Sequence, residues 1–188
     1  KSRFASTGIY IFEPEVLALI PPGKTFDIGS ELFPLLVEKG LPFFAQKRFF
    51  NWIDIGRLHD YWDVSMRVLR GEVAQMDMPG KELREGVWTG LNVSISPDAV
   101  IKGPVYIGSN VRIEAGVHIE GPAWIGHGSV IRQGVTLRSS IVFEYTRISA
   151  HQSMQDMIIS PNYVVERSGL THYLGEENSP FVWGDARG

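Results

Sequence analysis

The chain contains no cysteine among its 188 residues. This excludes disulfide bonds and cysteine-ligated zinc, and it fits a reducing cytoplasm. The sequence also lacks the run of roughly eighteen apolar residues that a membrane span needs, and no charged-then-apolar leader opens it. It has no basic run, and its net charge is −3, so neither a nucleic acid nor a membrane is expected as a partner. With 44% hydrophobic and 11% aromatic residues, the composition predicts a folded globular protein.

An aliphatic residue returns at every sixth position from Ile95 to Leu137, and a second series of mostly small or β-branched residues follows four positions behind it. Six residues of α-helix turn through roughly 600°, so such a series cannot share a helix face, whereas even offsets share one face of an extended chain. Turn residues such as Gly103-Pro104 and Gly121-Pro122 recur at the same phase. The pattern predicts a parallel β-helix built from hexapeptides over residues 87–160, followed by a tail over 161–188. An antiparallel barrel is the alternative, but it would place hairpin turns about every eight to twelve residues. The two series are Ile95, Ile101, Ile107, Ile113, Ile119, Ile125, Ile131 and Leu137, and Ala99, Val105, Val111, Val117, Ala123, Ser129, Val135 and Ile141.

The residues before the repeats mix aromatic runs with helical patterns. Phe4–Phe12 and Leu41–Phe50 are rich in aromatic residues and predict buried strands. Helices are expected to start at Pro14, over 30–39 and over 58–70, the last two ended by glycines. Residues 72–86 contain Pro79-Gly80 and alternating charges, and they predict a linker after a domain of residues 1–71.

Asp54 interrupts the apolar stretch NWIDIG, at residues 51–56. A buried carboxylate is costly unless it is paired or bound to a metal, so Asp54 at a strand end is a candidate ligand for a hard cation. The alternative is an exposed acid that caps the following helix.

The ordered motifs STGIY, FDIGSELFPLL, NWIDIG, VLRGEV and PGKELREGVW, followed by hexapeptides, resemble bacterial sugar-phosphate nucleotidyltransferases, in particular mannose-1-phosphate guanylyltransferases. The resemblance implies a left-handed, three-sided β-helix with about eighteen residues per coil, preceded by the C-terminal part of a Rossmann-like α/β domain. It also implies the coupling of a sugar 1-phosphate, here mannose 1-phosphate, to a nucleoside triphosphate, here GTP, with release of pyrophosphate and assistance from magnesium.

The same resemblance implies roles for individual residues. Asp54 corresponds to the magnesium ligand, and Ser6, Thr7, Gly8 and Tyr10 correspond to the strand that lines the sugar site. The family's usual Asn is Ser6 here, and Arg57 stands where a helix-capping Thr or Ser is common. No GxGxRL-like nucleotide loop, second metal aspartate or sugar-contacting Glu-Lys pair occurs in the sequence. We therefore expect a C-terminal fragment of a longer enzyme, inactive by itself, with its catalytic residues upstream.

Two other functions compete with this interpretation. In a hexapeptide-repeat acyltransferase, His118, His127 or His151 would act as the general base toward an acyl-coenzyme A. In a non-enzymatic module, the β-helix would serve assembly or regulation. Self-association into a homo-oligomer is expected through an exposed last coil and outward aromatic residues such as Trp88, Tyr106 and Trp124. The alternative is that the tail after Ser160 folds back as a cap over the last coil and leaves a monomer.

Overall fold

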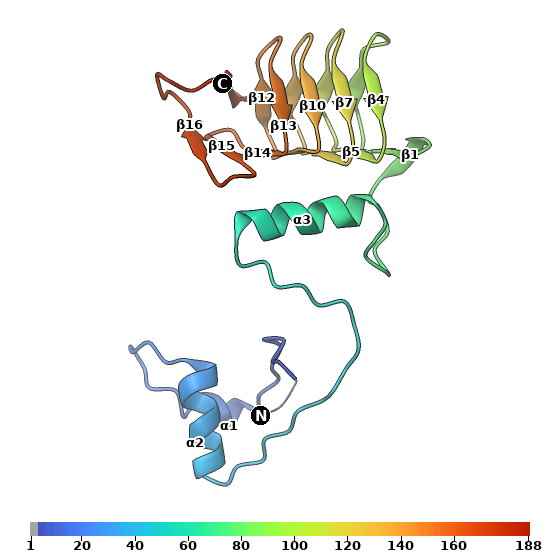
Figure 1. Ribbon diagram of the computed structural model, residues 1–188. Helices are drawn as coiled ribbons and strands as arrows, with labels where there is room; N and C mark the ends of the chain where they lie inside the picture. The colour runs from blue at the N-terminus through green and yellow to red at the C-terminus, as the bar shows by residue number, and fades with distance from the viewer. Residues whose placement is uncertain (1–3) are drawn as a thin grey trace. The chain divides into compact units, whose positions relative to one another are not determined.

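The computed structural model describes residues 4–188 and divides into two compact units. The first unit ends at Trp52, and the second runs from Ile53 to Gly188. Figure 1 shows short helices in the first unit, and stacked strands with one longer helix in the second. Within residues 4–188, none of the helices combines the length and apolarity that crossing a membrane requires.

The first unit contains three short helical segments, α1 (Pro14–Leu17), the π-helical η1 (Ile28–Leu32) and α2 (Phe33–Glu38). Pro14 takes the first helical position, as predicted, and Gly40 with a φ of +63° follows α2. Asp27 caps η1, because its carboxylate accepts a hydrogen bond of 2.6 Å from the Ser30 backbone N–H. The hydrogen bonds from Ser30 also lower the pKa of the Asp27 carboxyl.

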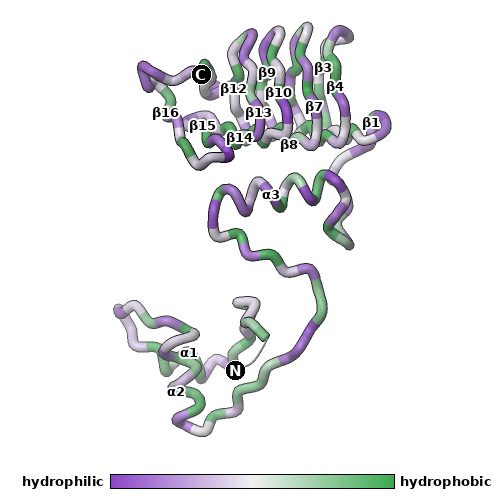
Figure 2. Tube along the Cα trace, viewed as in Figure 1, coloured by the Kyte–Doolittle hydropathy of each residue, from purple (hydrophilic) through white to green (hydrophobic). Residues whose placement is uncertain are grey.

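The strands predicted over residues 4–12 and 41–50 are not formed, since the described part of the first unit contains no strand. Their apolar side chains are exposed, to 98% for Ile11, 86% for Phe44 and 90% for Phe49. A buried strand needs neighbours that take its backbone hydrogen bonds and cover its faces. Residues 4–52 supply no such neighbours, so the prediction is wrong for this chain, although the hydrophobic colouring of these stretches in Figure 2 still shows the pattern that prompted it.

The second unit is a three-sided parallel β-solenoid (Figure 1). One sheet has the order β1-β2-β5-β8-β11-β14-β15-β16, a second β13-β10-β7-β4, and a third β17-β12-β9-β6-β3. Strands of successive coils pair in parallel, which excludes the antiparallel barrel. The strands are β1 (Lys81–Arg84), β2 (Val87–Thr89), β3 (Ser94–Ile95), β4 (Val100–Lys102), β5 (Val105–Ile107), β6 (Arg112–Ile113), β7 (His118–Glu120), β8 (Ala123–Ile125), β9 (Val130–Ile131), β10 (Thr136–Arg138), β11 (Ile141–Val142), β12 (Thr146–Ile148), β13 (Ser153–Gln155), β14 (Met157–Ile159), β15 (Tyr163–Glu166), β16 (Thr171–Tyr173) and β17 (Trp183–Asp185).

The interior of the solenoid holds the two predicted series. Ile107, Ile125 and Leu137 of the first series have no exposed surface, and neither do Val105 and Val117 of the second. Each coil covers the apolar side chains of its neighbour, which gives the close packing typical of protein cores. The hexapeptide interpretation is thus confirmed.

One inward position was predicted wrongly. Paired residues lie 18 positions apart from Val105 to Ala123, but 17 apart from Trp124 to Ile141. Because side chains alternate between the faces of a strand, this single lost residue turns Ile141 outward and gives the inward position to Val142. Ile141 is still buried, because a helix covers the outer face there.

That helix is α3 (Leu58–Leu69), which packs on the outer face of the eight-stranded sheet. Its Trp62 and Met66 join a buried cluster with Ile141 and Ile158, and the Trp62 Nε1–H donates a 3.0 Å hydrogen bond to the Ser139 carbonyl. The helix therefore belongs to the solenoid unit. Strand β1, within residues 72–86, pairs with β2. The structure accordingly groups residues 53–86 with the repeats and does not divide the chain at a linker over 72–86.

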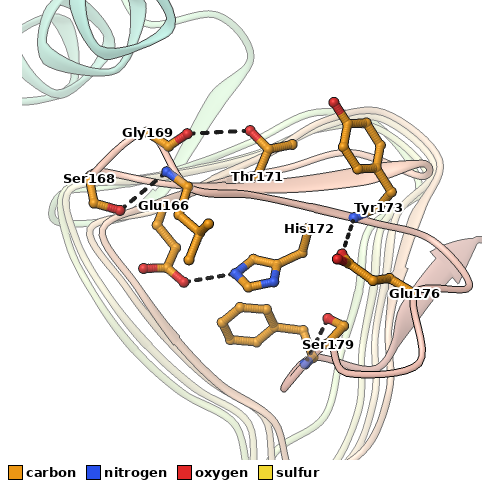
Figure 3. Close-up of polar contacts among 10 residues, drawn as sticks. Glu166, Ser168, Gly169, Thr171, His172, Tyr173, Glu176 and Ser179 are labelled. Atoms are coloured by element: carbon orange, nitrogen blue, oxygen red, sulfur yellow. Dashed lines mark hydrogen bonds and ion pairs between the residues drawn. The ribbon is translucent and has the colours of Figure 1, made fainter.

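The tail over residues 161–188 folds back onto the end of the solenoid. Strand β15 pairs antiparallel with β14, β16 pairs with β15, and β17 pairs antiparallel with β12. We call residues 161–188 the cap. Figure 3 shows polar contacts within the cap, among them the 2.8 Å contact between His172 Nε2 and Glu166 Oε1. His172 is only 9% exposed. The last coil is therefore covered, and the open end expected from the sequence is not present.

Candidate functional site

The STGIY motif forms a tight polar turn in the first unit. The Ser6 and Tyr10 hydroxyls lie 2.8 Å apart, and the Gly8 N–H donates to Ser6 Oγ at 3.3 Å. Gly8 has a φ of +76°, and a Cβ at this position would meet no atom within 4 Å. The Trp52 indole donates to the Thr7 carbonyl at 3.1 Å. The turn thus presents two adjacent exposed hydroxyls beside open space.

Tyr10 is held by aromatic neighbours rather than by burial. Its ring packs edge-on against Phe33 at 5.1 Å and stacks on Phe12 at 5.9 Å, while the residue remains 37% exposed. Hydroxyl groups both donate and accept hydrogen bonds, so Ser6 and Tyr10 suit the recognition of a hydroxylated ligand. All four predicted sugar-site residues lie in this turn.

Asp54 lies at the start of the second unit, in an extended segment that forms no strand, and it is exposed. The prediction of a strand-end position is therefore wrong, because the preceding strand is not formed. Among the described residues, no group of three or more His, Cys, Asp or Glu side chains could hold a metal ion. Magnesium commonly takes one or two protein carboxylates and completes its shell with phosphates and water. The exposed Asp54 carboxylate fits that minimal role.

The three histidines proposed as acyltransfer bases have structural roles in the coils of the solenoid. His118 contacts the Gly116 carbonyl through Nδ1 at 3.1 Å, and the His127 ring packs edge-on against Tyr145 at 5.3 Å. His151 turns a corner with a φ of +60°. The depression beside His118 measures about 100 Å³, far below the size of pockets that enclose drug-sized ligands. Within residues 4–188, the pocket lined by His118 is therefore too small to enclose a ligand of the size of an acyl-coenzyme A.

A larger cavity of about 320 Å³ lies between the start of α3 and the cap. Arg57 and Trp62 line it from the helix side, and Arg167, Ser168 and Thr171 line it from the hairpin of β15 and β16. Of the cavity's residues, the sequence motifs singled out only Arg57, which stands where a helix-capping Thr or Ser is common. The cavity's hairpin residues Arg167, Ser168 and Thr171 come from the tail, whose sequence shows no periodicity.

Two known families match successive parts of the chain. Residues 1–71 match the nucleotidyl transferase family, and residues 101–171 match the GMPPB C-terminal domain. The first match contains STGIY, NWIDIG and α3, and the second contains most of the solenoid and the hairpin of the cap.

The chain is 46% identical over 165 residues to a UTP–glucose-1-phosphate uridylyltransferase of Synechocystis, which covers 87% of this chain and 42% of that protein. It is 33% identical over 78 residues to a glucose-1-phosphate adenylyltransferase of Bacillus cytotoxicus, covering 38% of this chain and 21% of that one. A glucose-1-phosphate adenylyltransferase of Fusobacterium nucleatum is 30% identical over 99 residues, 47% of this chain and 26% of the enzyme. The chain thus spans less than half the length of each of these relatives.

The ordered motifs, the solenoid and both family matches agree, and they confirm the resemblance of this chain to the sugar-phosphate nucleotidyltransferases, over residues 1–71 to the nucleotidyl transferase family and over residues 101–171 to the GMPPB C-terminal domain.

Proposed function

We propose that the complete protein couples a sugar 1-phosphate to a nucleoside triphosphate and releases pyrophosphate. The observation that carries this proposal is the 46% identity to a uridylyltransferase over 165 residues, which extends across both units. In this reaction a phosphate oxygen of the sugar attacks the α-phosphorus of the triphosphate. The bond to the β-phosphate breaks, and pyrophosphate leaves.

The substrates we favour are UTP and glucose 1-phosphate, because the Synechocystis relative is named for them and two further relatives are named for glucose 1-phosphate. GTP and mannose 1-phosphate are the second candidates. They are favoured by the ordered motifs and by the match of residues 101–171 to the GMPPB C-terminal domain. That match does not include the STGIY turn, so we give it less weight in choosing the sugar.

In this proposal the STGIY turn binds the sugar. The Ser6 and Tyr10 hydroxyls, 2.8 Å apart, exchange hydrogen bonds with sugar hydroxyls, and Gly8 leaves room for the ring. Asp54 contributes one carboxylate to a magnesium ion that neutralises phosphate charge. Neutralising charge on the transferring group is usually a large part of catalysis in such transfers.

A pyrophosphate-release assay on the full-length protein tests the proposal. UTP and GTP would each be paired with glucose 1-phosphate and mannose 1-phosphate, and we expect the fastest turnover with UTP and glucose 1-phosphate. Asp54→Asn should lower turnover by a factor on the order of one hundred, the usual cost of losing one transition-state electrostatic contact. Asp98→Asn, an exposed solenoid carboxylate, is the matched control and should leave turnover unchanged. No turnover with any pair would overturn the proposal.

Two further expectations belong to the proposal. The 188-residue chain alone should show no turnover, because its sequence contains no nucleotide loop. Oligomerisation also stays a prediction, although the cap covers the last coil and the Tyr106 and Trp124 rings pack against the cluster under α3. Light scattering of the chain at micromolar concentration distinguishes a monomer of 21.0 kDa from larger species.

A further inference from the structure

The cavity between α3 and the cap is half-open to solvent and large enough for a small molecule. Its volume of about 320 Å³ lies at the lower end of the range for ligand pockets. Its floor is apolar, formed in part by Trp62, Ile158 and Val165. Its rim carries polar groups from the hairpin of β15 and β16, and Figure 3 shows Ser168 and Thr171 on this hairpin.

Two arginines from different elements line this cavity without strong acidic partners. The Arg57 carbonyl accepts a 3.1 Å hydrogen bond from the Tyr61 N–H, but its guanidinium group makes no hydrogen bond or ion pair within the described range 4–188. The Arg167 guanidinium lies over the Trp62 ring at 4.7 Å, and its nearest carboxylate oxygen, from Asp63, is 3.8 Å away. Such an exposed, long ion pair contributes little, so both guanidinium groups remain able to bind an anion.

The acidic residues of the cavity are engaged elsewhere. Glu166 contacts the buried His172 at 2.8 Å, and the Asp156 carboxylate accepts a hydrogen bond of 3.2 Å from the Gln155 side chain. His59, also on the cavity wall, contacts Asp60 at 3.2 Å. The two carboxylates keep their negative charge, and Arg57 is the charged lining residue whose side chain has no polar partner within residues 4–188.

An arginine at position 57 does not stabilise the start of α3. It is the N-cap residue of α3, with extended backbone angles, and its side chain makes no capping hydrogen bond. A guanidinium has no acceptor, so it cannot cap the free N–H groups of the first turn as Ser, Thr or Asp would. The sequence thus forgoes a helix cap at this point and places a cation at the cavity wall.

We propose that this cavity binds the phosphate group of a small phosphorylated molecule, with Arg57 and Arg167 as its cationic ligands. Guanidinium groups donate paired hydrogen bonds that match phosphate oxygens. The Ser168 oxygen accepts a hydrogen bond from the Leu170 N–H at 3.3 Å, which leaves the Ser168 hydroxyl hydrogen free to donate. Trp62 and its apolar neighbours pack against the remainder of the ligand.

The site goes beyond the proposed enzymatic function and has its own consequence. Arg57 follows Asp54 by three residues, so an occupied cavity would hold the segment that carries Asp54 against the cap of the solenoid. Binding itself requires no catalysis. The site can therefore be tested on the 188-residue chain even if the proposed reaction proves wrong.

Isothermal titration calorimetry on the 188-residue chain tests the site with inorganic phosphate and with glucose 6-phosphate, a phosphate ester outside the proposed reaction. We expect saturable binding that weakens with added sodium chloride. Arg57→Gln should weaken it at least ten-fold, the usual scale for a charge-assisted hydrogen bond in a ligand site. Arg112→Gln, an exposed arginine on another face of the same solenoid, should leave binding unchanged.

The two ligands separate two sources of the phosphate. Tighter binding of the ester indicates that Trp62 and the hairpin contact the organic part, and equal affinities indicate a site for inorganic phosphate. Thermal unfolding of each variant without ligand verifies that Arg57→Gln remains folded. The inference is overturned if neither ligand binds at millimolar concentration, or if Arg57→Gln and Arg112→Gln weaken binding equally.

Discussion

The two units of this chain contain similar proportions of apolar residues, but the solenoid buries them and the first unit leaves many of them exposed. In the solenoid, Ile107, Ile125 and Leu137 are completely buried. In the first unit, Ile11 and Phe49 are 98% and 90% exposed although they belong to equally apolar stretches. A solenoid coil finds its pairing partner 17 or 18 residues away, whereas a strand of an α/β sheet depends on partners far along the chain.

Truncating one isoleucine in each unit to alanine tests this difference in burial. Ile125→Ala should destabilise the solenoid by about 3 kcal/mol, because it removes buried methyl groups and leaves a cavity between coils. Ile11→Ala removes the same atoms from an exposed side chain and should leave the solenoid's unfolding midpoint unchanged. Urea unfolding followed by circular dichroism measures both. Equal losses for the two variants would show that residues 4–52 and the solenoid unfold as one body.

This contrast also explains how much the sequence could predict. The hexapeptide period identified the solenoid and nearly all of its core, because position within the repeat decides which face a residue occupies. It misplaced Ile141, since a one-residue deletion in a coil reverses the faces while leaving the sequence equally apolar. The cap and α3 contacts were beyond prediction, because they join residues such as Trp62 and Ser139, which are 77 positions apart.

Of the candidate site, only the residues within short sequence motifs could be predicted. STGIY located the paired Ser6 and Tyr10 hydroxyls, which interact over four residues. The cavity with Arg57 and Arg167 could not be found from the sequence, because 110 positions separate the two arginines and no period relates them.

A second pair of variants separates close packing from backbone strain. At Gly108 an added Cβ would lie 2.7 Å from the His127 backbone nitrogen in the next coil, and backbone cannot move aside. Gly108→Ala should therefore destabilise the solenoid by about 2 kcal/mol, as overpacking usually does. Gly8→Ala meets open space and strains only its own turn, so the solenoid transition should not move. A tolerated alanine at Gly108 in thermal unfolding would contradict the close approach of coils.

The attachment of α3 gives a smaller effect. Trp62→Phe keeps an aromatic ring in the buried cluster but loses the hydrogen bond to the Ser139 carbonyl. We expect a loss of about 1 kcal/mol and faster amide hydrogen exchange in residues 58–69, with exchange in β5 and β8 unchanged. If α3 exchanges as slowly in the variant as in the parent chain, the hydrogen bond does not hold the helix on the sheet.

The smallest expected effect concerns the last residues of the solenoid unit. Hydrogen bonds from the Arg187 side chain and backbone lower the pKa of the Asp185 carboxyl to about 2, from an ordinary value of 3.8. Because the folded pKa is the lower one, ionised Asp185 stabilises the folded state fully above pH 3.8. That contribution declines as the pH falls toward about 2 and vanishes below it. The Asp185 side chain is 34% exposed, so solvent screening keeps the effect small. Asp185→Asn should lower the unfolding midpoint slightly at pH 6, and the difference from the parent chain should disappear as the pH approaches 2.

Asp98→Asn, which removes an exposed carboxylate from an early coil, should show no such pH-dependent difference. A gap between Asp185→Asn and the parent chain that stays constant from pH 6 to pH 2 would mean that the charge of Asp185 does not stabilise this end of the solenoid.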